Sequence, residues 1–151
     1  MMGKLRDILS TAAERGQALG RSYQGEVTPQ EAHDLLHLAP GAKLVDVRTR
    51  AELDWVGRVP GAVEIEWNLY PGGARNPHFL AELTRQVDRE ALVLFLCRSG
   101  ARSIGAATLA SEAGYNQCYN ILEGFEGDKD ASSHRNTVGG WRKTSLPWTQ
   151  G

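Results

Sequence analysis

Apolar residues recur every three or four positions over residues 1–20 of the chain. This spacing is typical of an amphipathic helix, which has one apolar and one polar face. Gly16 and Gly20 are the candidate ends of this helix, because glycine commonly follows the last helical turn. The apolar positions are Leu5, Ile8, Leu9, Ala12, Ala13 and Leu19.

A second helix is predicted to begin at Pro29. Proline is tolerated in the first helical turn, and Glu31 stands three positions after Thr28, as a capping box requires. Farther along the chain, short apolar or alternating runs predict strands, and periods of 3.6 residues predict helices. The predicted strands span residues 43–48, 62–67, 91–96 and 118–122, and the predicted helices span residues 49–55, 77–87 and 103–114.

Strands and helices therefore alternate along most of the chain. This alternation predicts an α/β fold with a mostly parallel central sheet of about five strands, flanked by helices on both faces. We treat residues 1–22 as an N-terminal amphipathic helix and residues 23–151 as a single domain. Ligands of such sheets bind beyond the carboxyl ends of the strands, so the residues that follow each strand are the first candidates for a site.

The composition limits the classes of function. Of the 151 residues, 41% are hydrophobic and 23% are charged, and the net charge is −1, which is ordinary for a globular protein. Without an excess of positive charge, we expect neither nucleic acid nor an acidic membrane as a partner. No apolar run approaches the roughly 20 residues that span a bilayer, and residues 1–20 lack the apolar stretch of a signal peptide. We therefore expect a cytoplasmic protein.

The apolar run 91–96 ends at Cys97, a candidate nucleophile. We expect its thiol at the mouth of a ring of backbone N–H groups and beside a helix N-terminus, two features that stabilise a thiolate. Gly100 permits the positive φ that a tight ring needs. Cys118 lies in a predicted strand and is expected to be structural, and the cysteines lack metal-ligand spacing, so no metal site is expected. The residues after Cys97 are Arg98, Ser99, Gly100, Ala101, Arg102 and Ser103.

Several groups of residues occur in a fixed order: Leu44-Val45-Asp46-Val47-Arg48, Glu52-Leu53, the turn 57–62, the loop 97–103, Gly139-Gly140-Trp141 and Leu146-Pro147. In this order they resemble the rhodanese-like family of single-domain sulfurtransferases, over residues 27–148. The resemblance implies that Cys97 takes sulfane sulfur from thiosulfate or a similar anionic donor. The resulting persulfide would pass its outer sulfur to cyanide or a thiol, and the resemblance implies no cofactor.

The resemblance also implies roles around Cys97. The backbone of residues 98–103 would hold the substrate, Arg102 would close the loop, and Asp46 and Arg48 would support it. The charges of Arg98 and Arg102 are expected to attract the anionic donor, while Arg48 is spaced to pair with Glu52. A sulfur-relay protein is a further candidate partner, and the helix in residues 1–22 is a candidate surface for a homodimer.

The sequence leaves two other functions open. Cysteine phosphatases and arsenate reductases also place a thiolate in a loop before a helix, but their arginine follows the cysteine after five intervening residues. Here Arg102 comes one position too early, and the shorter ring suits sulfur better than a phosphoryl group. A non-catalytic binding module of the same fold is the other alternative.

The last part of the chain carries two further expectations. Residues 124–140 are polar and rich in glycine, which predicts either a mobile flap or a surface loop. Trp141 and Trp148 are expected to cover the edge of the core.

Overall fold

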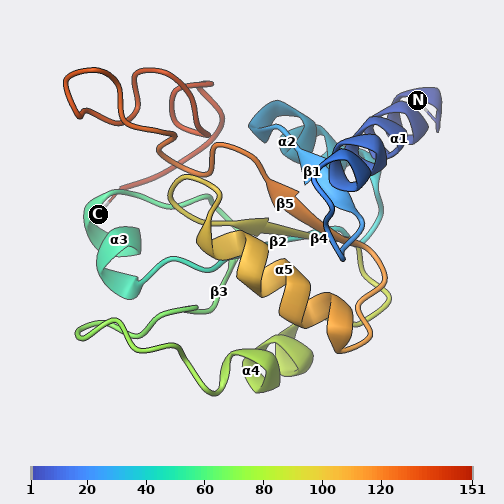
Figure 1. Ribbon diagram of the computed structural model, residues 1–151, viewed down its shortest axis with the longest axis horizontal. Helices are drawn as coiled ribbons and strands as arrows, with labels where there is room; N and C mark the ends of the chain where they lie inside the picture. Colours follow the sequence, from blue (N-terminus) through green and yellow to red (C-terminus); the bar gives the residue numbers. More distant parts are fainter. Residues whose placement is uncertain (1, 151) are drawn as a thin grey trace.

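The computed structural model describes residues 2–150 and shows one sheet of five strands covered by helices (Figure 1). The strand order across the sheet is β1-β5-β4-β2-β3, and neighbouring strands are parallel throughout. The structure thus confirms the α/β arrangement that the alternation of strands and helices predicts. The strands are β1 (Gly25–Val27), β2 (Lys43–Asp46), β3 (Val63–Glu64), β4 (Val93–Leu96) and β5 (Cys118–Ile121).

Helices lie on both faces of the sheet (Figure 1). One face packs against α1, α2 and the C-terminal segment, and the other packs against α4 and α5. Strand β4 is apolar throughout because its side chains alternate between these two buried faces, with Leu94 on the first and Phe95 on the second. The helices are α1 (Met2–Ala18), α2 (Pro29–Leu38), α3 (Arg50–Trp55), α4 (Phe79–Gln86) and α5 (Arg102–Glu112).

Two helices begin at capping boxes. The Glu31 N–H donates to Thr28 Oγ1 at 3.2 Å, and the Thr28 N–H donates to Glu31 Oε1 at 2.9 Å, which confirms the predicted start of α2. Thr49 and Glu52 make the same exchange at the start of α3, at 3.3 and 3.1 Å. These bonds satisfy N–H groups that have no partner inside the helix, so even the six-residue α3 has a defined start.

Two strands differ from the sequence prediction. The sequence pattern does not predict β1, because β1 has three residues and its middle residue, Glu26, is a charged residue that lies fully buried. The predicted strand 62–67 has regular pairing only over β3. The reason is that β3 is an edge strand, after which the chain turns back on itself and bridges Asn68 to Arg75.

The C-terminal segment covers one edge of the core. Trp141 is fully buried and its indole N–H donates to the Pro147 carbonyl at 2.8 Å. Trp148 packs against the same cluster and is partly buried. The two rings therefore cover the core edge as the sequence predicts. Within residues 2–150, no helix combines the length and the apolar character needed to cross a membrane.

Candidate active site around Cys97

Cys97 directly follows β4, at the carboxyl end of the central part of the sheet. The Gly100 N–H donates to Cys97 Sγ at 3.1 Å, and Ser103 Oγ lies 3.3 Å from the same sulfur. The loop therefore folds back over the thiol before α5 begins at Arg102. Gly100 has φ of +105°, which confirms the predicted need for a residue without a side chain at this turn.

Backbone N–H groups around the thiol are free to bind an anion. Among residues 2–150, no hydrogen-bond partner accompanies the N–H groups of Ser99, Ala101 and Arg102, and no side chain caps the N-terminus of α5. Unpaired N–H groups at a helix N-terminus carry partial positive charge and favour negative charge nearby. The loop is thus suited to an anionic substrate or a thiolate.

The position of the sulfur differs from the expectation in one respect. Cys97 is only 1% exposed, so its sulfur lies at the floor of the loop and not at the mouth. The cause is local: the last residues of β4 are buried on both faces of the sheet, and the loop closes over the sulfur through the Gly100 N–H. A reacting molecule therefore has to reach Cys97 past the backbone of the loop.

The segment after β5 holds the start of this loop. The Phe125 N–H donates to the Cys97 carbonyl at 2.8 Å, and the N–H groups of Glu126 and Gly127 donate to the Arg98 carbonyl at 2.9 and 3.2 Å. Gly124 has no room for a side chain, because a Cβ there would lie 2.5 Å from the Cys97 carbonyl oxygen. The base of the glycine-rich segment 124–140 is therefore a backbone clamp on the loop.

Arg102 is bound by Glu52 through two hydrogen bonds of 2.7 and 2.8 Å. Burial alone would raise the pKa of Glu52, but the bonds from Arg102 and from Thr49 outweigh it and lower that pKa to about 2. The bonds to Glu52 likewise raise the pKa of Arg102. Arg102 thus closes the loop by tying it to α3, and part of its charge is neutralised there.

Arg48 pairs with Asp46, and the predicted pairing of Arg48 with Glu52 is wrong. Both Arg48 and Asp46 are fully buried, and Arg48 Nη2 lies 2.7 Å from Asp46 Oδ2. Arg48 pairs with Asp46 because the two residues are close in the chain: Asp46 also accepts the backbone N–H of Arg48 at 3.1 Å. The guanidinium lies 4.1 Å from the centre of the Phe125 ring. The pair therefore supports the clamp residue Phe125 and reaches the loop through it.

Three further residues belong to the site although the sequence analysis did not assign them to it. Glu52 binds Arg102, while Asn120 and Glu26 extend the hydrogen bonds of Ser103 away from Cys97. Glu26 and Asn120 are partners in the register of β1 and β5. A polar residue inside an otherwise apolar strand is the sequence signal that marks Asn120. The same signal applies to Glu26 only once β1 is known, because the sequence pattern does not predict that strand.

The second cysteine lies at the amino end of the strands, opposite to the end that carries Cys97. Cys118 begins β5, whereas Cys97 follows the end of β4, and the two strands are parallel. Burial raises the pKa of the Cys118 thiol to about 12, so this thiol stays protonated and unreactive at neutral pH. Both thiols are free. Cys118 is therefore a suitable control position for tests of Cys97.

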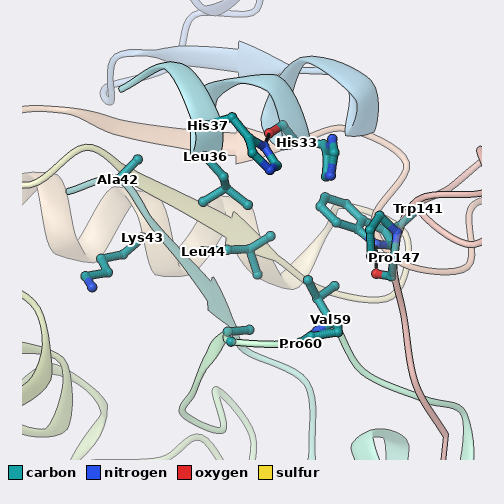
Figure 2. Close-up of a pocket in the computed structure, with 12 residues that line it drawn as sticks. His33, Leu36, His37, Ala42, Lys43, Leu44, Val59, Pro60, Trp141 and Pro147 are labelled. Atoms are coloured by element: carbon teal, nitrogen blue, oxygen red, sulfur yellow. Dashed lines mark hydrogen bonds between the residues drawn. The ribbon is translucent and has the colours of Figure 1, made fainter. Parts of the chain in front are cut away.

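A separate cleft of about 370 Å³ lies on the other face of the sheet. Figure 2 shows His33 and His37 projecting from α2 toward the cleft, with Trp141 and Pro147 on one side and Val59 and Pro60 below. None of its lining residues comes from the loop 97–103. Within residues 2–150, no three His, Cys, Asp or Glu side chains gather in a way that could hold a metal ion.

Comparison with known proteins places these features in a family context. The family model described as Rhodanese-like domain matches residues 28–131, which include Asp46, Arg48 and the whole Cys97 loop. The chain is 38% identical over 124 residues to Uncharacterized protein RC0915 of Rickettsia conorii, across 78% of this chain and 91% of the relative. It is 30% identical over 112 residues to the thiosulfate sulfurtransferase GlpE of Tolumonas auensis, across 74% of this chain and 94% of that protein.

A solved structure resembles most of the chain. The crystal structure of Rv0390 from M. tuberculosis is 48% identical in sequence and superposes with a TM-score of 0.80. The match covers 86% of this chain and 100% of that chain. Fold and sequence comparisons therefore agree over the part of the chain that carries Cys97.

Proposed function

Because the chain belongs to the family of rhodanese-like domains, we propose that it is a sulfurtransferase that carries sulfane sulfur as a persulfide on Cys97. One observation carries the proposal: the Cys97 sulfur accepts the Gly100 N–H and lies beneath unpaired N–H groups at the N-terminus of α5. This environment stabilises the negative charge that sulfur chemistry places on the nucleophile and on the leaving group. Thiosulfate is the proposed donor, in line with the relative from Tolumonas auensis.

The proposed reaction is a double displacement. The Cys97 thiolate attacks the outer sulfur of thiosulfate, an S–S bond forms to Cys97, and sulfite leaves with the electron pair of the broken S–S bond. Cyanide or a thiolate then attacks the outer sulfur of the persulfide. The new bond forms to that acceptor, and the Cys97 thiolate is released for another cycle. No outside oxidant or reductant is consumed.

Charges around the loop support an anionic donor. Arg98 directly follows Cys97 and is exposed, and its carbonyl is fixed by the clamp segment, so its charge is available to an approaching anion. The charge of Arg102 interacts with Cys97 and Asp46, but Glu52 offsets part of it. We therefore assign the attraction of the donor chiefly to Arg98 and the shape of the loop to Arg102.

Mass spectrometry after incubation with thiosulfate tests the proposal directly. The peptide that contains Cys97 should gain about 32 Da, and cyanide should remove this mass and form thiocyanate. Cys97→Ser should abolish the gain and the thiocyanate. Cys118→Ala is the matched control. It should keep the mass gain and the thiocyanate formation, because Cys118 is buried at the amino end of the strands, away from the Cys97 loop. Full activity of Cys97→Ser would contradict the proposal.

The same protein separates sulfur transfer from phosphate chemistry. The loop is one residue shorter than a cysteine-phosphatase loop, so the wild-type chain should hydrolyse p-nitrophenyl phosphate no faster than Cys97→Ser does. Hydrolysis that depends on Cys97, without sulfur loading, would favour a phosphatase. A chain that neither loads sulfur nor hydrolyses the phosphate ester would be a binding module.

A further inference from the structure

A chain of buried polar side chains leads away from the Cys97 sulfur. Ser103 Oγ lies 3.3 Å from Cys97 Sγ, and its hydroxyl donates to Asn120 Oδ1. Asn120 Nδ2 donates in turn to Glu26 Oε1 at 2.8 Å. These side chains come from α5, β5 and β1, and each residue is at most 1% exposed. We call Ser103, Asn120 and Glu26 the polar chain.

The far end of the polar chain carries a charge. Glu26 Oε2 accepts hydrogen bonds from the Tyr23 hydroxyl and, at 3.1 Å, from Arg21 Nε. A buried carboxylate is unfavourable unless its partners replace water, and an apolar residue would pack more simply inside β1. Glu26 also lies outside residues 28–131, the part that the family model matches. The burial of the Glu26 carboxylate behind the loop therefore has to be explained by the residues that it contacts.

The hydrogen bonds of Asn120 have defined directions, and these directions connect Glu26 to Ser103. Two acceptors lie near Asn120 Nδ2: Glu26 Oε1 and, at 3.4 Å, the Gly100 carbonyl. Because both need a donor, the amide nitrogen and not the amide oxygen of Asn120 faces them. Asn120 Oδ1 therefore faces Ser103 and accepts a hydrogen bond from its hydroxyl. The Ser103 oxygen then presents a lone pair to Cys97, which suits a protonated thiol. When the sulfur loses its proton, the same hydroxyl can turn and donate to it.

We propose that Ser103 is a positioning residue whose hydroxyl proton turns toward the Cys97 sulfur when that sulfur is charged, and that Asn120 and Glu26 keep the Ser103 side chain next to the sulfur. The inference takes Cys97 as the reacting atom and in this sense rests on the proposed function. Ser103 would stabilise the thiolate by donating to it. Glu26 would act against the thiolate, because its negative charge is fixed two hydrogen bonds beyond Ser103.

Other charged groups surround the polar chain, and their effects have to be separated from it. A pocket of about 300 Å³ adjoins Asn120, Glu26 and the loop. The charged and titratable groups nearby are Arg98 and Arg102 of the Cys97 loop, Asp46 and Glu52 facing Arg102, Arg21 and Tyr23 on Glu26, Arg15 on the Glu26 carbonyl, and Glu123 and Asp128 at the pocket.

The test measures the rate at which iodoacetamide alkylates Cys97, followed by mass spectrometry of the Cys97 peptide from the full chain between pH 5 and pH 10. Ser103→Ala removes the donor, so the midpoint of the pH–rate profile should rise by about half a unit or more. Ser103→Thr keeps the hydroxyl and should return the midpoint toward that of the wild type. Glu26→Gln removes the fixed negative charge and should lower the midpoint by a similar amount.

Asp128→Asn is the matched control, because Asp128 is an exposed carboxylate at the same pocket that makes no bond to the polar chain. Its midpoint should equal that of the wild type. Opposite shifts for Ser103→Ala and Glu26→Gln, with rescue by Ser103→Thr, support the proposal. Unchanged midpoints, or shifts of both variants in one direction, overturn it, because loss of packing alone gives no reason for opposite signs.

Sulfur loading is measured on the same variants, so the two proposals can fail separately. If wild-type Cys97 takes no sulfur from thiosulfate but the midpoints shift as expected, the proposed function is wrong and the polar chain still controls the thiol. If Cys97 loads sulfur and the midpoints do not move, the sulfurtransferase proposal stands and the role of Ser103 is overturned.

Discussion

At the scale of single residues, the Glu52–Arg102 ion pair connects the Cys97 loop to a neighbouring helix. It joins the N-terminal turn of α3 to the N-terminal turn of α5, fifty positions apart in the sequence. The side chains are 18% and 25% exposed, so solvent weakens the pair without removing it. Glu52 also caps α3 through Thr49, so one carboxylate serves both the helix and the loop.

This pair predicts a specific dependence of stability on pH. The folded-state pKa of Glu52, about 2, lies below its ordinary value of 4.5. The carboxylate therefore adds stability above pH 4.5, and the contribution is lost as the pH falls from there toward 2. Glu52→Gln keeps an acceptor for the cap but removes the charge. At pH 7 it should lower the free energy of unfolding by about 1–2 kcal/mol after allowing for solvent.

Urea unfolding at a series of pH values checks this expectation. The difference in stability between the wild type and Glu52→Gln should shrink between pH 4.5 and pH 3, where the wild-type carboxylate begins to lose its advantage. Glu31→Gln is the comparison, because Glu31 caps α2 and binds Arg15 at 2.6 Å in the same manner but has no bond to the Cys97 loop. A difference that stays constant down to pH 3 would show that the Glu52 charge does not contribute.

At the scale of elements, the hydrogen bonds between the segment after β5 and the start of the Cys97 loop are made by backbone atoms on both sides. Gly124 has φ of +64°, and an added Cβ would meet the Cys97 carbonyl oxygen at 2.5 Å. Backbone on both sides cannot move aside as a flexible side chain can. The clamp therefore fixes where the loop starts, and α5 and the Glu52–Arg102 pair fix where it ends.

Gly124→Ala should consequently disturb both stability and sulfur transfer. We expect a loss of about 2–4 kcal/mol from the left-handed backbone and the steric clash together. Sulfur loading of Cys97 should fall roughly tenfold or more, because small displacements of a reacting group reduce rates strongly. Gly114→Ala is the matched control: its φ is +101°, but its Cβ meets only the flexible side chain of Arg89 at 3.5 Å.

Thermal unfolding and the mass-spectrometric loading assay distinguish the two variants. Gly114→Ala should lose stability through its backbone conformation and keep its rate of sulfur loading. Equal loading rates for Gly124→Ala and Gly114→Ala would mean that the clamp does not position the loop.

At the scale of the whole molecule, the sequence predicts what is local and misses what the sheet order creates. The capping box at Thr28 and the loop after Cys97 are contiguous segments, so their conformation follows from neighbouring residues. Glu26 and Asn120 are 94 positions apart and meet only because β1 pairs with β5. A strand of three residues with a charge at its centre gives too weak a pattern to reveal that pairing.

Strand order also bears on the role of the first helix. β1 is an edge strand that pairs only with β5, and α1 lies against it, with Ile8 and Ala12 buried in the core cluster that contains Leu94. The close contact between α1 and β1 depends on a glycine, because a Cβ at Gly16 would lie only 2.9 Å from the Gly25 Cα. We therefore expect α1 to belong to the same cooperative unit as the sheet.

Removal of residues 1–22 tests this expectation. Two buried apolar side chains and the Arg21–Glu26 pair would be lost, so the shortened chain should be less stable by at least about 2 kcal/mol in urea unfolding. Ile8→Ala in the full chain should show part of this loss while keeping the arginine contacts, which separates packing from charge. An unchanged urea midpoint for the shortened chain would mean that α1 is only an appendage of the domain. A lower stability with a changed pH–rate profile for Cys97 alkylation would link the segment 1–22, through the contact of Arg21 with Glu26, to the reactivity of the thiol.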